Sequence, residues 1–139
     1  MREENKAVVR CFYEEFVSTG TTDGLEELIA PDYAEVVDGV RHPAGIAGAK
    51  EHITGVRRTY HDLHMVIERQ IAEGEWVATC YTMHGIHAEA YGGMRPTGKP
   101  VAITGVNVDR VVDGRIVEHG GAANMLGPLL ASGAVRVAD

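Results

Sequence analysis

The feature that most constrains this chain is an Asp113-Gly114 pair between two runs rich in β-branched residues. Residues 101–112 (VAITGVNVDRVV) precede the pair, and residues 115–124 (RIVEHGGAAN) follow it. Asp-Gly is a favoured sequence for a two-residue hairpin turn, because both central positions need a positive φ. The sequence therefore predicts an antiparallel hairpin in which Val112 lies opposite Arg115.

The register of this hairpin decides which side chains share a face, because side chains alternate along a strand. In a regular ladder, Asp109 lies opposite Glu118, and Ile103 lies opposite Asn124. One face then collects the polar residues Asn107, Asp109, Glu118 and Asn124. The other face carries Val106, Val108, Arg110, Val112, Val117 and His119. Two interpretations stay open: the polar face is solvated over a valine core, or it lines a cavity while the valine face meets a second layer or a partner subunit.

The N-terminal part of the chain follows the helical period instead. Apolar residues at spacings of three and four predict a helix over residues 3–18 and another over about residues 48–60. Asp23 is a candidate N-cap for a short helix between them, which Pro31 would end. The apolar tail, residues 125–135, is expected to form a short helical cap.

The strand period begins after these helices. Residues 63–67 alternate between apolar and polar side chains, and residues 76–91 form a longer β-rich run with a bulge or bend expected at Gly85. Residues 92–100 have the composition of a loop. Helices followed by a meander of antiparallel strands predict the α+β class. We expect one domain over residues 1–139, in which N-terminal helices wrap a strongly curved antiparallel sheet and enclose an apolar pocket.

Charge and composition narrow the possible partners. The formal net charge is −7 and the basic residues are scattered, which argues against a nucleic-acid partner, because phosphate binding needs a basic face. No apolar run is long enough for a membrane span, and the start of the chain is too polar for a signal peptide. Cys11 and Cys80 lie far apart in apolar segments, as buried free thiols would. We expect a cytoplasmic protein.

Five segments of the chain together resemble the SnoaL-like polyketide cyclases, in register from about residue 4 to residue 130. They are ENKAVVRCFYEEFVSTG, LEELIAPDYAEV, YHDLHMVIERQIAEGEWVATCYTMHGIH, GMRPTGKPV and VVDGRIVEHGGAANMLG. The resemblance implies the cone-shaped α+β barrel of the ketosteroid isomerase and nuclear transport factor type. It also implies that the polar hairpin face points into the pocket. The best-known members close a ring of an aromatic polyketide by intramolecular aldol condensation, without cofactor or metal.

The resemblance also raises a question about the catalytic group. The family's acid/base is an aspartate whose position is taken here by Asn124, and an amide cannot abstract a proton. The family's aromatic residue four positions earlier is replaced by Gly120. The carboxylates of Asp109 and Glu118, expected about 5 Å apart across the hairpin, are the alternative acid/base candidates, with Asp109 preferred. Each could instead form a salt bridge or lie exposed at the end of the hairpin.

Other side chains are candidates for substrate binding. Asn107 and Asn124 could orient a substrate carbonyl, although Asn124 is equally suited to capping the helix that follows. Pocket contact is predicted for the residues Phe12, Phe16, Tyr33 and Tyr81, and for His87, which matches a histidine common in the family. His84 and His87 are three apart and face opposite sides of a regular strand, so we predict no metal site.

Together with these residues, the resemblance implies a small enzyme that needs no cofactor and acts on a hydrophobic small-molecule substrate. This substrate would be an aromatic polyketide or similar hydrophobic carbonyl compound, and the reaction a cyclisation or isomerisation. Asp109 would be the acid/base, with Asn124, Asn107 and His87 assisting. Two alternatives stay open: a component of polyketide hydroxylation, and a ligand-binding protein without turnover. If the polar face lines the pocket, the opposite face is too apolar to remain exposed to solvent. That face carries Val106, Val108, Val117 and His119. A homodimer through the sheet is therefore expected.

Overall fold

The computed structural model describes residues 2–90 and 93–139. Its helical elements are α1 (Arg2–Cys11), the π-helix η1 (Phe12–Val17), the 3₁₀ turn η2 (Leu25–Glu27), α2 (Gly45–Thr59) and α3 (Leu126–Ser132). Its strands are β1 (Ile29–Val37), β2 (Val40–Pro43), β3 (Tyr60–Glu73), β4 (Trp76–His87), β5 (Pro100–Val112) and β6 (Arg115–Ala123). The predicted run 76–91 and loop 92–100 include Tyr91 and Gly92, which lie outside the described residues.

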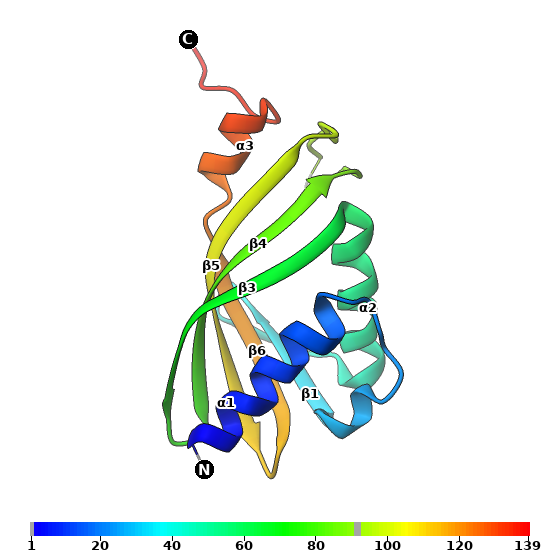
Figure 1. Cartoon of the computed structure of the whole chain (residues 1–139), viewed down its shortest axis with the longest axis vertical. Helices are drawn as coiled ribbons and strands as arrows, with labels where there is room; N and C mark the ends of the chain where they lie inside the picture. Colours follow the sequence, from blue (N-terminus) through cyan, green and yellow to red (C-terminus); the bar gives the residue numbers. More distant parts are fainter. Residues whose placement is uncertain (1, 91–92) are drawn as a thin grey trace.

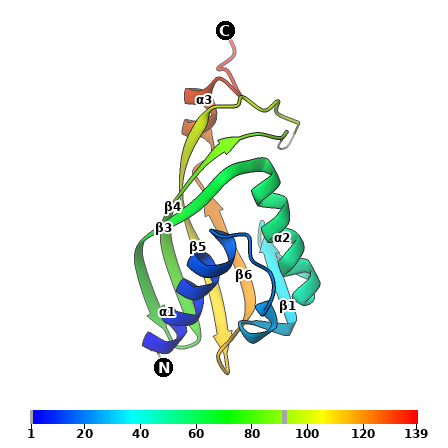
Figure 2. The same ribbon diagram turned by 45° about the vertical axis from the view of Figure 1, so that its right-hand side comes forward.

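The six strands form one curved, open sheet in the order β2-β1-β6-β5-β4-β3. Neighbouring strands are antiparallel except β1 and β6, which run parallel. The helices α1 and α2 lie against the same side of the long, bent strands, as Figures 1 and 2 show. The α+β class and the curved sheet wrapped by helices are confirmed. The parallel pairing of β1 with β6 was not expected.

The helix predictions are confirmed at both ends of the chain and wrong in one place. Segments α1 and η1 together cover the predicted 3–18 helix up to Val17, α2 covers the predicted 48–60 helix up to Thr59, and α3 forms the predicted cap. The helix expected from Asp23 shrinks to the three-residue turn η2, preceded by Gly24 with a φ of 85° and no side-chain cap. Ile29 already belongs to β1, and the strand continues through Pro31. Proline is tolerated there because the β1–β6 register is irregular between Ile29 and Ala34.

The core lies between the inner face of the sheet and the helices. Along β4 the inner side chains are buried in strict alternation, which is the period-two pattern of a strand with one covered face. The bulge predicted at Gly85 lies on the neighbouring strand instead: β4 pairs regularly with β5 through Gly85, and the register shift opposite Gly85 falls in β3, between His61 and His64. The alternative of a bend at Gly85 stays a prediction. Gly85 is needed because a Cβ at this position would lie 2.9 Å from the Cβ of Tyr60.

The β5–β6 hairpin has the predicted turn but not the predicted register. Asp113 and Gly114 have φ values of 51° and 77°, and Val112 pairs with Arg115. Beyond Val111 the register then shifts by one residue, because Val117 is an extra residue in β6 and forms a β-bulge. Every pairing beyond this point differs from that of the regular ladder.

The shift corrects the two predicted pairs beyond the bulge and moves the residues between them as well. Asp109 lies opposite His119 instead of Glu118, Asn107 lies opposite Gly121, and Gly105 lies opposite Ala123, so Asn124 is not paired with Ile103. His119 therefore turns from the expected valine face to the inner face. Glu118 pairs with Arg110 and leaves the inner face. The expected pair of neighbouring carboxylates does not form.

Two further observations concern the surroundings of the chain. Among the described residues, no helix is long and apolar enough to cross a membrane. Cys11 and Cys80 are both free thiols, as expected, although each is half-buried rather than fully buried.

The inner sheet face should dominate stability. Val77 is 0% exposed in the core, whereas Val137 in the tail is 79% exposed. We expect Val77→Ala to lower the free energy of unfolding by about 2 kcal/mol, through lost apolar burial and the cavity left behind. Val137→Ala should change it by less than about 0.5 kcal/mol. Urea unfolding followed by circular dichroism measures both, and equal losses in the two variants would contradict this core.

Candidate active site

A cavity of about 580 Å³ lies between the inner face of the sheet and the helical layer. This size is typical of small-molecule sites, which hold a few polar groups on a mostly apolar wall. Its apolar lining includes Phe12, Val17, Ile53, Val56, Leu63, Met65, Tyr81, Met83 and Met125. Its polar lining includes Tyr13, Glu35, Asp38, His52, Asn107 and His119. The expected apolar pocket is therefore present, with chemically active groups on its wall.

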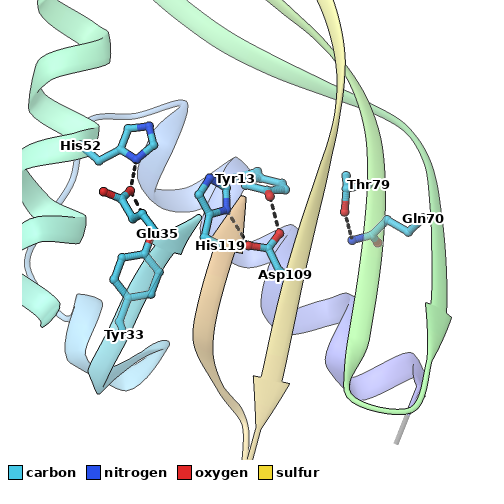
Figure 3. A network of polar contacts seen from close by, with 8 residues as sticks. All are labelled: Tyr13, Tyr33, Glu35, His52, Gln70, Thr79, Asp109 and His119. Carbon is cyan, nitrogen blue, oxygen red and sulfur yellow. Dashed lines mark hydrogen bonds and ion pairs between the residues drawn. The ribbon is translucent and has the colours of Figure 1, made fainter. Parts of the chain in front are cut away.

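A buried carboxylate organises one part of this wall. Asp109 of β5 is 0% exposed, and both of its oxygens accept hydrogen bonds (Figure 3). The hydroxyl of Tyr13 donates to Oδ2 at 2.5 Å, and Nδ1 of His119 lies 2.6 Å from Oδ1. Since a carboxylate only accepts, Nδ1 carries the proton in this pair. The other ring nitrogen of His119, Nε2, is not bonded to Asp109.

The buried pair changes the proton affinities of its members. Burial alone would lower the pKa of His119, but the charge of Asp109, its hydrogen bond and the charge of Glu35 outweigh burial, so the pKa is raised above 6.5. Burial raises the pKa of Tyr13 far above 10, and the charge of Asp109 raises it further. Tyr13 therefore stays a neutral donor, and the protonated form of His119 is favoured.

A second polar cluster, which the sequence did not reveal, lies beside the first. Oε2 of Glu35 accepts a hydrogen bond from the Tyr33 hydroxyl at 3.2 Å and forms a short contact with Nδ1 of His52. The rings of His52 and His119 are 5.6 Å apart and nearly perpendicular. Figure 3 shows His119 between Asp109 and this second cluster. Spacing could have indicated part of it, because Tyr33 and Glu35 are two apart and share a strand face.

The structure brings only some of the predicted binding residues to the cavity. Phe12, Tyr81 and Asn107 line it. Tyr33 is buried behind the wall and reaches it only through Glu35, and Phe16 packs against the core cluster. His87 is buried with its ring 5.7 Å from that of Tyr60. Phe16, Tyr33 and His87 are not among the lining residues that the structure describes.

The predicted catalytic residues are separated from one another. Asp109 lies within the wall and is linked to the cavity through its two hydrogen-bond partners, Tyr13 and His119, which both line it. Glu118, opposite Arg110, has left the inner face because of the bulge. Asn124 is exposed after the end of β6, and its backbone N–H donates to the Thr104 carbonyl at 2.8 Å. The residues directly before and after Asn124 line the cavity. Asn124 itself is not among the lining residues that the structure describes.

Two glycines of β6 mark close approaches around the site. A Cβ at Gly120 would lie 2.9 Å from the carbonyl oxygen of Val36, so the neighbouring β1 excludes the aromatic residue expected from the family pattern. A Cβ at Gly121 would lie 2.4 Å from Oδ1 of Asn107. The absence of both side chains lets β1 and the Asn107 amide sit close to β6 on the cavity wall.

Comparisons with known proteins agree with this architecture. The family model described as SnoaL-like polyketide cyclase matches residues 7–131. The chain belongs to the SnoaL-like polyketide cyclase family. Nogalonic acid methyl ester cyclase from Streptomyces nogalater is 32% identical to it over 106 residues, which cover 73% of this chain and 78% of that one.

Solved structures of SnoaL-like proteins share the fold. IdmH from Streptomyces antibioticus, a candidate polyketide cyclase, superposes with a TM-score of 0.75 at 28% identity, covering 94% of this chain and 99% of that one. AclR from Streptomyces galilaeus, a candidate hydroxylase, gives a TM-score of 0.82 at 24% identity, covering 100% and 87%. A candidate SnoaL-like cyclase from Jannaschia sp. CCS1 gives 0.83 at 20%, covering 97% and 95%.

The arrangement in this SnoaL-like chain suits proton transfer. A histidine held by a buried carboxylate and facing an apolar cavity can exchange a proton with a ligand through Nε2. His84, half-buried on the outer face, and His87, buried, point to opposite sides of β4 as predicted. Within residues 2–90 and 93–139, no cluster of three or more His, Cys, Asp or Glu side chains is placed to hold a metal ion.

The Asp109–His119 pair should be visible in a titration. Asp109→Asn removes the charge that outweighs burial, so the pKa of His119 should fall. Titration of the histidine ring protons by NMR measures this, and Glu14→Gln, on an exposed carboxylate paired with Arg10, serves as the matched control. An unchanged His119 titration in Asp109→Asn would contradict the pair.

The same pair links stability to pH. Because the folded pKa of His119 lies above its unfolded value, its stabilisation is fully present below about pH 6.5 and is lost as the pH rises through the folded pKa. We expect this loss to disappear in His119→Gln, as urea unfolding across this pH range would show. A parent protein whose stability rises over the same range would contradict the assignment.

Proposed function

We propose that this SnoaL-like protein closes a ring in an aromatic polyketide ester by an aldol-type reaction, with His119 as the acid/base. The observation that carries the proposal is the position of His119: its ring lines the cavity, and Nδ1 is bound to the buried Asp109. The family and the similarity to a nogalonic acid methyl ester cyclase support the cyclase type of reaction. The size and lining of the cavity support a hydrophobic carbonyl compound as substrate.

In this proposal, Asp109 and Tyr13 are positioning residues. Asp109 fixes the orientation of the His119 ring and stabilises its protonated form, and Tyr13 satisfies the second carboxylate oxygen. His119 can donate its Nε2 proton to a substrate carbonyl as negative charge develops there. The chemistry needs no redox step, so we propose a reaction without cofactor. Asn107 on the cavity wall is proposed to orient the substrate, and orienting roles for His87 and Asn124 stay predictions.

Turnover of a panel of aromatic polyketide methyl esters tests these roles. His119→Gln and Asp109→Asn should each lower kcat by about 10²–10⁴-fold, which is the usual effect of losing an acid/base group. Asn124→Ala should lower kcat far less, by about tenfold at most, because a typical hydrogen bond contributes only about 0.5–1.5 kcal/mol. The product should be an isomer of the substrate, as mass spectrometry would show.

Other outcomes would favour the alternative functions. Full turnover in both His119→Gln and Asp109→Asn would remove this pair from the mechanism. A product heavier by one oxygen atom would indicate the hydroxylase type of chemistry. Tight binding of the panel without turnover would indicate a ligand-binding protein. Activity that arises only in Asn124→Asp would mean that the natural chain is not a cyclase.

We also propose a homodimer through the outer face of the sheet. This face exposes the large apolar side chains Val66, Trp76, Val106 and Val108, between 40% and 43% each, and such patches mark interaction surfaces. His119 is not part of it, because the β-bulge turns that ring inward. A cytoplasmic location stays a prediction from the sequence.

The dimer is tested by one added charge. Val106→Lys places an ammonium group within the apolar patch, so the dimer should dissociate at micromolar concentration. Val137→Lys, in the exposed tail, should leave it intact. Light scattering coupled to size-exclusion chromatography measures the mass, and a parent protein that is already monomeric would contradict the dimer.

A further inference from the structure

A second carboxylate on the cavity wall is a direct neighbour of His119. In the parallel β1–β6 pair, Glu35 is the register partner of His119. Both residues line the cavity, so their side chains share the inner face. The parallel pairing, which the sequence did not predict, therefore places a carboxylate and an imidazole side by side.

Glu35 is held in place but still open on one side. The Tyr33 hydroxyl and Nδ1 of His52 both contact Oε2, and neither contact uses Oε1. The side chain of Glu35 is 24% exposed, whereas that of Asp109 is 0% exposed. A substrate in the cavity can thus meet a Glu35 oxygen directly, whereas the lining residues Tyr13 and His119 lie between the cavity and Asp109.

The geometry points to Glu35 as the base that takes the proton from the substrate carbon, while the neighbouring His119 protonates the carbonyl oxygen. This inference rests on the proposed cyclisation and deepens it, because it gives the two proton transfers to two different groups. Glu35 would be a catalytic residue, and Tyr33 and His52 would be its positioning residues. The single aspartate that the family pattern places at the end of the hairpin strand would be replaced by a pair on adjacent strands.

The proton and electron balance closes without another reactant. The carbon next to the ester carbonyl loses its proton to Glu35, the C–H electrons form a C=C bond, and the carbonyl oxygen takes the proton of His119 Nε2. The resulting enol then attacks the second carbonyl carbon and forms the new C–C bond. The enol proton returns to His119, and the new alkoxide takes the proton held by Glu35. One C–H bond and one C=O π bond are replaced by one C–C and one O–H bond.

The charges around Glu35 suit this division of roles. Burial alone would raise the pKa of Glu35, but the hydrogen bond and charge of His52, the Tyr33 hydroxyl and the charge of His119 outweigh it, so the pKa lies below 4.5. Glu35 is therefore ionised near neutral pH. His119 is held in its protonated form by Asp109 and by Glu35 itself. Asp38, at the end of β1, is the other carboxylate of the cavity lining.

Hydrogen exchange isolates the first proton transfer from ring closure. A substrate analogue that keeps the acidic methylene but lacks the second carbonyl should exchange its methylene protons in heavy water when the parent enzyme is added, as NMR would show. Glu35→Gln should slow this exchange by about 10²–10⁴-fold, and Glu35→Asp should restore part of it. Glu14→Gln, on an exposed carboxylate away from the cavity, should exchange like the parent.

The pH profile separates a positioning role of His52 from a merely structural one. Ionised Glu35 is needed for the reaction, so kcat/KM should fall at low pH with the pKa of Glu35. His52→Ala removes a contact that lowers this pKa, and the acidic limb should move to higher pH. A lower kcat/KM whose acidic limb stays at the same pH as in the parent would mean that His52 has only a structural role.

The outcomes distinguish this inference from the function on which it rests. A parent enzyme that neither cyclises the ester panel nor exchanges the analogue overturns the proposed function and the role of Glu35 together. A parent enzyme that does both, with exchange undiminished in a folded Glu35→Gln, overturns the role of Glu35 alone. Loss of exchange in Glu35→Gln with recovery in Glu35→Asp supports it.

Discussion

The structure of the site depends on one buried carboxylate that must be fully hydrogen-bonded. Removing a charge from water costs several kcal/mol, so an ionised group in a core persists only with partners. Asp109 has two, and they come from different parts of the chain: Tyr13 from η1 and His119 from β6. These contacts tie the N-terminal helical segment and the last strand to β5. The same requirement that stabilises the core also fixes a histidine on the cavity wall.

The β-bulge in β6 is what makes this arrangement possible. In a regular ladder, with Val117 opposite Arg110, Glu118 would lie opposite Asp109, and His119 would point outward. Two unpaired carboxylates would then meet in an apolar interior, which is unfavourable. With the bulge, Asp109 lies opposite His119, and the valine side chains stay on the outer face. Bulges are common next to active sites because they re-aim a side chain in this way.

Much of the fold was predictable because its signals are periodic and local. Apolar spacing indicated α1 and α2, and the Asp113-Gly114 turn indicated the β5–β6 hairpin. The β1–β2 pair was missed because Leu25, Leu28 and Ile29 also match a helical face, and Pro31 suggested a helix end. The site was only partly predictable. The inward position of Asp109 follows from alternation before the bulge, but the position of His119 depends on a one-residue insertion that alternation cannot reveal. Glu35 and His52 meet only through the three-dimensional packing of α2 on β1.

Under the proposed function, the acid/base group of this SnoaL-like chain has changed place while the cavity is kept. An amide stands where the family pattern has an aspartate, and a histidine supported by Asp109 faces the cavity from the same strand. The most direct test is to ask which side chain touches the reacting oxygen. Nitrogen NMR of the protein with a bound, unreactive phenol analogue of the substrate makes this measurement. The account predicts that the Nε2 signal of His119 shifts on binding, while Nδ1 stays a donor to Asp109. An unchanged His119 ring together with a shifted Asn124 amide would contradict it.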